Sequence, residues 1–185
     1  EWIKSQIKEH KTQAFIICPF IQESESLISV KAAIKEYEML KKELFENFEL
    51  GLLHGRLKIK DKNTVLDKFR GGEINILVAT PVVEVGIDIP NATVIVIETS
   101  ERFGLSQLHQ LRGRVGRGEQ QSYCLLFTES KGEQTIKRLK AMETMRVGAE
   151  LAELDLKLRG PGEMYGTMQH GVRQLKTASF SDFPL

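Results

Sequence analysis

The stretch "HQLRGRVGRG" (residues 109–118) places three arginines and three glycines in ten positions. Guanidinium groups are planar and permanently charged, and they suit bidentate contact with phosphate oxygens. If a helix includes residues 110–117, Arg114 and Arg117 share one face and aim at a phosphoryl group. The alternative is a solvated basic face. The glycines favour the phosphate interpretation, because a solvated helix has no need of residues that cost about 1 kcal/mol each, whereas glycines let another surface approach closely.

A second candidate stretch, "ATPVVEVGIDIPNA" (residues 79–92), follows an apolar run that has the character of a buried strand. Gly86 permits a tight turn, and Asp88 then presents a carboxylate that can accept hydrogen bonds from ribose hydroxyls. The Thr80 hydroxyl can donate to a phosphate. Two alternatives stay open at this point: Asp88 merely caps a turn, and Thr80 is a strand-end threonine without a ligand.

The sequence lacks the pattern G-x-x-x-x-G-K-[ST], and it lacks an acidic magnesium-binding motif of the Walker-B kind. Arginines positioned for a phosphate without the loop that holds it suggest half of a composite site. We therefore expect the other half of the site to lie on an N-terminal part of a longer protein.

Composition excludes several classes of protein. The 185 residues suffice for one domain of ordinary size with a small appendage, and no apolar run is long enough to cross a bilayer. The net charge is +1, so any nucleic-acid binding must come from local clusters, of which residues 101–118, with four arginines against one glutamate, are the densest. The start of the sequence has neither an initiator methionine nor a signal-peptide core, and we expect the chain to be part of a longer protein.

Cysteine and histidine usage points to a reducing compartment without a metal site. Cys18 and Cys124 each sit in an apolar run, which predicts two buried structural thiols and a cytoplasmic location. The four histidines have no metal-ligand spacing.

Five short apolar runs predict buried strands, because they are nearly continuous rather than alternating in hydrophobicity. They lie at 14–18, 50–54, 74–79, 93–98 and 123–127. Helical patterns separate most of them: one carries apolar residues from Ala33 to Phe48, one has Asp61 as its N-cap and stops at the glycines 71–72, and one covers 105–112. This alternation predicts an α/β fold with a parallel sheet and helices on both faces.

After the last strand the pattern changes. Residues 131–147 look helical, with Ile136, Leu139, Met142 and Val147 on one side, and 148–158 can form a second short helix. This tail is too small to form a core of its own, so we expect a helical hairpin, followed by a loop, that packs on the rest of the chain.

These stretches resemble motifs of superfamily-two helicases: "ILVATPVVEVGIDIPNA" resembles motif V, "QLHQLRGRVGR" motif VI, and "GLLHGRL" the motif IV region. The run "ERFGLSQLHQLRGRVGRGEQQSYCLLF" resembles the RecG family of bacterial branched-DNA helicases. The tail "RLKAMETMRVGAELAELDLKLRGPGEMYGTMQHG" resembles the translocation motif that this family shares with Mfd, the transcription-repair coupling translocase. The resemblance implies a parallel-sheet RecA-like helicase C-terminal domain at 1–130, and a translocation-motif hairpin and tail at 131–185.

The resemblance also implies roles for individual residues. Arg117 matches the arginine finger of motif VI and Arg114 would share its task, while Gln110 would help link nucleotide to the interdomain cleft. Gly86 and Asp88 match positions that contact the ribose. The positions matched to DNA contacts are Thr80, His54 and Gly55. Those matched to translocation coupling are Arg138, Arg159 and Gln169. The implied cofactors are ATP and Mg²⁺, held mainly by an N-terminal motor domain. The implied partners are branched double-stranded DNA, such as stalled forks and Holliday junctions, and the first RecA-like and wedge domains of the same protein. Pro81, Met168 and His170 depart from the residues usual in the family.

Two rival functions remain. An Mfd-type translocase shares the tail, but its pattern before motif VI carries Ala-Tyr-Gly-Leu and a tyrosine in place of His109, whereas this chain has "ERFGLSQLHQ". The second rival is a non-catalytic α/β module that binds nucleic acid or a protein. A GKT-type loop and an acidic DExH-type motif upstream would favour the motor over the module.

The half-site interpretation makes a direct prediction. The chain by itself should not hydrolyse ATP, because it lacks a phosphate-binding loop. Phosphate release from a clean preparation of the 185-residue chain checks this, and appreciable intrinsic turnover would contradict the composite site.

Overall fold

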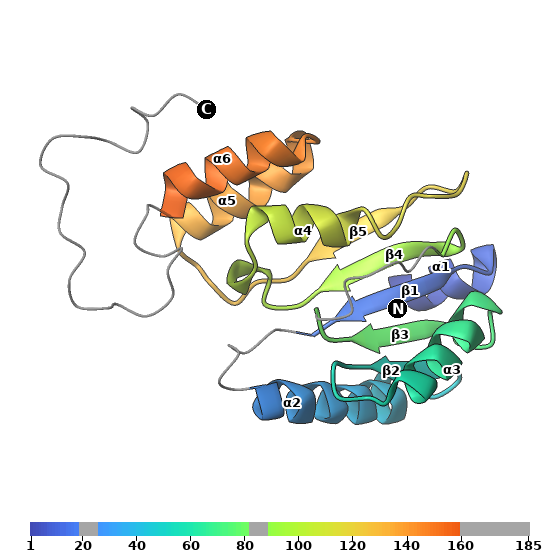
Figure 1. Cartoon of the computed structure of the whole chain (residues 1–185). Coiled ribbons are helices and arrows are strands. Elements are labelled where there is room, and N and C mark those ends of the chain that lie inside the picture. The colour runs from blue at the N-terminus through green and yellow to red at the C-terminus, as the bar shows by residue number, and fades with distance from the viewer. Residues whose placement is uncertain (19–25, 82–88, 160–185) are drawn as a thin grey trace, which may run out of the picture.

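A computed structural model describes residues 1–18, 26–81 and 89–159, and these contain a five-stranded, all-parallel sheet (Figure 1). The strands lie side by side in the order β2-β3-β1-β4-β5. Their bounds are β1 (Gln13–Ile17), β2 (Leu50–Leu53), β3 (Ile76–Ala79), β4 (Ala92–Ile97) and β5 (Tyr123–Leu126). All five predicted strands and the predicted parallel α/β sheet are confirmed.

Helices cover both faces of this sheet. Their bounds are α1 (Trp2–His10), α2 (Ser26–Met39), α3 (Ile59–Arg70), α4 (Leu105–Arg112), α5 (Glu133–Thr144) and α6 (Gly148–Arg159). On one face, residues of α1 and α2 pack against Ala14 and Ile16 of β1. On the other, residues of α3 to α6 pack against Phe15 and Ile17 of the same strand. Successive side chains of a strand point to opposite faces, so a strand buried on both faces needs the continuous apolar sequence seen here.

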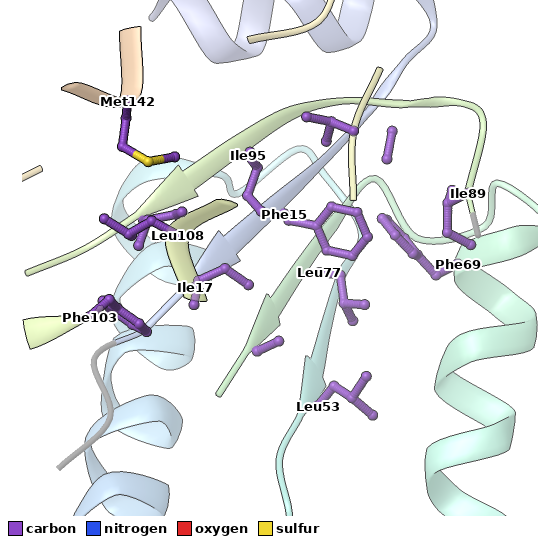
Figure 2. Packing of buried hydrophobic residues seen from close by; sticks show 14 of the residues in the cluster. Phe15, Ile17, Leu53, Phe69, Leu77, Ile89, Ile95, Phe103, Leu108 and Met142 are labelled. Atoms are coloured by element: carbon purple, nitrogen blue, oxygen red, sulfur yellow. The ribbon is translucent and has the colours of Figure 1, made fainter. Parts of the chain in front are cut away.

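The larger core lies under α3 and α4 (Figure 2). Phe15 and Phe69 meet edge to face, with ring centroids 5.1 Å apart. Leu105 and Leu108 of α4 are fully buried, and Met142 of α5 and Leu151 of α6 belong to the same cluster. The α5–α6 pair therefore shares the core of the sheet domain, as expected for a segment too small to form its own.

The predicted helical hairpin is present. α5 and α6 lie side by side over α4, joined by a three-residue connection (Figure 1). The predicted apolar side of α5 is correct for Leu139 and Met142, which are buried, but wrong for Val147, which lies beyond the helix and is 52% exposed.

The helix predicted up to Phe48 ends earlier. After α2 the chain forms a π-helical turn (Leu40–Leu44), closed by a hydrogen bond of 2.7 Å from Phe45 N to Leu40 O. The wider turn shifts the helical register, so Leu44 is 48% exposed while Phe45 and Phe48 pack together in the core beyond the helix. Helix α1 was not predicted.

The cap assigned to the second predicted helix is also wrong. α3 begins at Ile59 with Lys58 as its N-cap. Asp61 lies in the first turn, where its carboxylate interacts favourably with the positive end of the helix dipole. The predicted stop is correct: Gly71 is the C-cap, and Gly72 has a φ of +79°.

Both cysteines are free thiols. Cys18 is buried, as predicted, whereas Cys124 is only half-buried. Burial raises the pKa of both thiols, that of Cys124 to about 11. In the described ranges, no helix is long and apolar enough to span a membrane.

Candidate nucleotide and DNA site at the carboxyl edge of the sheet

Two predicted DNA-contacting residues lie next to each other at the carboxyl edge. Leu53 of β2 pairs with Ala79 of β3, and the next residues along the two strands are His54 and Thr80. The amide of Thr80 donates to the carbonyl of Leu53 at 3.1 Å, so the pairing continues to the strand ends. Parallel register thus brings together two side chains that are 26 residues apart in sequence.

His54 and Thr80 each hold a buried polar atom that lacks a hydrogen-bond partner among the described residues. These atoms are His54 Nδ1 and Thr80 Oγ1, and the two residues are 9% and 3% exposed. Unpaired buried polar atoms are costly and therefore uncommon, so a ligand contact is a natural use for them. Burial lowers the pKa of His54, and the charges of Lys62 and Arg56 lower it further, which favours the neutral imidazole. Neighbouring Gly55 is exposed, and its carbonyl accepts a hydrogen bond from Lys62 Nζ at 3.1 Å.

The prediction that Arg114 and Arg117 share one face of a helix is wrong. α4 ends at Arg112, with Gly113 as its C-cap, and Gly116 adopts a φ of +79°, which only glycine adopts without strain. These two glycines therefore end the helix and turn the chain. Beyond α4, Arg114 and Arg117 lie on a loop.

Arg114 nevertheless reaches the end of β3. It lines a small recess together with Thr80, Pro81 and Leu111. A second recess beside it is lined by Pro81, Gln110 and Arg114 among others. Arg114 and Gln110, both assigned to the nucleotide, thus converge on the first described residues of the 79–92 stretch.

The same loop also contacts the other end of that stretch. A Cβ atom on Gly118 would lie only 2.8 Å from the carbonyl oxygen of Pro90, so glycine is required for this close approach. Between these two contacts, Val115 is buried in the core and fixes the loop. Arg117 is exposed, and its Nε donates to Gly113 O at 3.0 Å, which orients the guanidinium through the backbone of the loop. The two motif-like stretches are therefore packed against each other at both described ends.

Arg112 and Arg138 bind backbone carbonyls of distant segments of the domain. Arg112 donates to the carbonyls of Met142 and Met145, at 2.7 and 3.1 Å. Arg138, assigned to translocation coupling, is 5% exposed and donates to the carbonyls of Glu101 and Phe103 at 2.7 and 2.8 Å. Sequence reasoning missed the role of Arg112, because no local pattern shows that a residue between Gln110 and Arg114 contacts a segment 30 residues away.

Several predicted site residues lie outside the described part of the chain. These are Gly86, Asp88 and Gln169. Arg159 is the last residue of α6, and its side chain also lies outside that part.

Glu98, at the end of β4, is a titratable group that the sequence analysis did not single out. Burial raises its pKa to about 7, and the nearby charge of Glu36 adds to the effect. Glu98 lines a cavity of about 350 Å³ with Thr99, Phe127 and others. Thr99 has a φ of +42°, a left-handed conformation that is uncommon for a β-branched residue. The signal that could have found Glu98 is its place directly after a buried strand.

The fold and this edge define a class of protein: the chain belongs to the family described as helicase conserved C-terminal domain, whose model matches residues 1–119. Within that class its similarity is to RecG. It is 53% identical over 179 residues to the ATP-dependent DNA helicase RecG of Synechocystis sp., covering 97% of this chain and 21% of that protein. It is also 53% identical over 166 residues to RecG of Thermotoga maritima, covering 90% and 21%. The chain thus spans about a fifth of the length of these relatives, and the predicted resemblance to RecG is confirmed.

Solved structures agree with this assignment. A structure of RecG bound to a three-way DNA junction superposes with a TM-score of 0.69 at 49% identity, covering 86% of this chain and 20% of that one. The second domain of the DEAD-box helicase Mss116p, bound to an RNA duplex, superposes with a TM-score of 0.60 at 23% identity, covering 78% and 53%. The latter likeness shows the RecA-like fold alone.

The raised pKa of Glu98 predicts how stability depends on pH. An acid whose folded pKa lies above its unfolded value stabilises the fold fully below about 4.5, and this stabilisation is lost as pH rises through about 7. Replacing Glu98 with Gln should remove about 1–2 kcal/mol of this dependence between pH 5 and 8, measured by chemical denaturation. Glu46→Gln, on an exposed turn, is the control and should keep the wild-type dependence. An unchanged pH dependence of stability in Glu98→Gln would show that burial does not raise the pKa of this carboxyl group.

Proposed function

We propose that the chain is the C-terminal motor domain of an ATP-dependent DNA helicase that remodels branched DNA, such as stalled forks and Holliday junctions, in recombination and repair. The observation that carries this is the packing of the loop at residues 113–118, the arginine loop, against the 79–92 stretch, with Gln110 and Arg114 meeting at Pro81. The RecG relatives and the RecG structure with a DNA junction support the same conclusion.

The arginine loop suits a role in trans. Gln110 and Arg114 would face nucleotide held mainly by a first RecA-like domain of the same protein, and Arg117 would serve as the arginine finger. When bound, ATP with Mg²⁺ supplies the phosphoanhydride bond whose hydrolysis releases free energy. The residues of this chain stabilise the charge that develops on the phosphoryl oxygens, an effect typically of about 10³–10⁵ in rate. Gly86 and Asp88 would contact the ribose.

The His54–Thr80 pair suits a DNA phosphate. The Thr80 hydroxyl can donate to a phosphate oxygen, and a neutral His54 can donate from Nδ1 when that nitrogen carries the proton. The backbone amide of Gly55 would add a third donor. Contacts to phosphate carry no base information, which fits a motor that must move along any sequence.

The remaining assignments complete the proposal. Residues 1–130 form the motor domain, and 131–185 the translocation motif, with Arg138, Arg159 and Gln169 coupling turnover to DNA movement. A wedge domain of the same protein would meet the branch point, and the protein would act in the cytoplasm. The Mfd-type alternative is less favoured, because the relatives at 53% identity are RecG proteins. The non-catalytic module is less favoured, because those relatives carry the name of an ATP-dependent helicase.

The arginine-finger assignment is tested in the full-length protein. Arg117→Ala should lower the kcat of DNA-stimulated ATP hydrolysis by about 100-fold or more, and Arg114→Ala should also lower it, while nucleotide binding persists. Arg70→Ala, an exposed arginine on α3, is the control. Intact ATPase activity in Arg117→Ala would refute the assignment.

The phosphate contact is tested with an isosteric change. Thr80→Val keeps the buried volume but removes the hydroxyl, and it should weaken binding of the full-length protein to forked DNA by about fivefold. Fluorescence anisotropy with labelled DNA measures this, and Thr64→Val, on the exposed face of α3, serves as the matched control. Wild-type affinity in Thr80→Val would place the DNA elsewhere.

A further inference from the structure

The α5–α6 hairpin is fastened to the C-terminal end of α4 by Arg112. Its Nη1 donates to Met142 O at 2.7 Å and to Met145 O at 3.1 Å, and its Nη2 lies 2.8 Å from His109 Nδ1. Met142 lies in the last turn of α5, and Met145 is its C-cap. Carbonyls at a helix C-terminus lack intrahelical donors and carry partial negative charge, so a guanidinium is well suited to bind them.

A second fastening lies at the N-terminal end of α4. Asp155 of α6 accepts a hydrogen bond from the amide of Leu105, the first residue of α4, at 3.0 Å. Its other carboxylate oxygen accepts from Arg138 of α5 at 3.2 Å. The side chains of Asp155 and Arg138 are 15% and 6% exposed, so solvent screens this ion pair only weakly. Asp155 therefore accepts a hydrogen bond from an amide that has no partner within α4. Its negative charge also interacts favourably with the positive N-terminal end of the helix dipole.

Between these two points the surfaces are in direct contact. A Cβ atom on Gly148, at the start of α6, would lie 3.0 Å from Cδ2 and 3.2 Å from Nε2 of His109. The hairpin thus packs closely on α4, and a side chain at Gly148 would have to displace the His109 ring.

We infer that Arg112 and Asp155 are positioning residues that clamp the α5–α6 hairpin to both ends of α4, so that the hairpin and the arginine loop move as one body. This inference rests on the proposed motor function. α4 leads directly into Arg114 and Arg117, and Leu105 and Leu108 hold it in the core independently of the clamp. Loosening the clamp should therefore leave the arginine loop in place and weaken its connection to the hairpin, which is then held by core packing alone. Neither residue belongs to the set assigned to nucleotide, DNA or coupling. Asp155 contacts Arg138 of that set, so the Arg112 variants are the decisive ones.

The test compares ATP turnover with DNA movement in the full-length protein. Arg112→Ala and Asp155→Asn should keep kcat and KM for ATP within about threefold of wild type on forked DNA. Strands separated per ATP hydrolysed should fall about tenfold, within the usual range of coupling between two sites. Arg112→Lys keeps the charge but cannot span three acceptors, and it should fall between Arg112→Ala and wild type. Arg70→Ala and Glu153→Gln, an exposed residue of α6, should behave as wild type.

Hydrogen exchange gives a readout independent of turnover. In Arg112→Ala, amides of α5 and α6 should exchange faster while those of β1 and β3 do not change, because only the clamp is opened. Unchanged exchange in the hairpin, or equal loss of ATPase and unwinding, would overturn the inference. If Arg112→Ala does not fold, Asp155→Asn and Arg112→Lys decide the question by the same measurements. Absence of DNA-dependent ATPase activity in the wild-type protein would instead refute the proposed function. Failure of the clamp inference can therefore be distinguished from failure of the proposed function.

Discussion

The parallel pairing of β3 with both β2 and β1 is the constraint on which the rest of the site depends. Parallel strands end at the same edge, so the register that matches Leu53 with Ala79 also places His54 beside Thr80. β4 pairs with β1 on the other side, and the chain leaves it through Glu98 at the same edge. A shift of one residue in either pairing would turn these side chains to the opposite face of the sheet. The apolar strands thus place the polar residues, although they carry no chemistry themselves.

The arginine stretch shows how one short sequence serves several contacts. Arg112, still within α4, turns to the hairpin and binds the carbonyls at the end of α5. Arg114 lies beyond the helix and meets Thr80 and Pro81. Arg117 follows the left-handed turn at Gly116 and is oriented by Gly113 O. Because each glycine changes the direction of the chain, arginines only two or three residues apart face different partners.

In the proposed motor, this division links the chemistry to the moving parts. The arginine loop is fixed by Val115 in the core and by the close approach of Gly118 to Pro90. The hairpin is joined to the helix that precedes the loop by the carboxylate of Asp155, which accepts from the amide of Leu105, and by the carbonyls of Met142 and Met145, which accept from Arg112. A rigid connection of this kind can pass a small displacement at the nucleotide to a distant segment without loss, because packed cores move as bodies rather than deform continuously.

The sequence by itself determined the five strands, the parallel sheet, the hairpin and the chemical character of the arginine stretch. It did so because buried strands, helices and guanidinium groups each leave a local pattern of residue types. Only the tertiary structure decided which arginine serves which partner. The carbonyls of Met142 and Met145 and the carboxylate of Asp155 come from segments 30 to 50 residues away from their partners on α4. The π-helical turn after α2 and the raised pKa of Glu98 were equally beyond local patterns. Each of these depends on packing and burial, which arise only when distant parts of the chain meet.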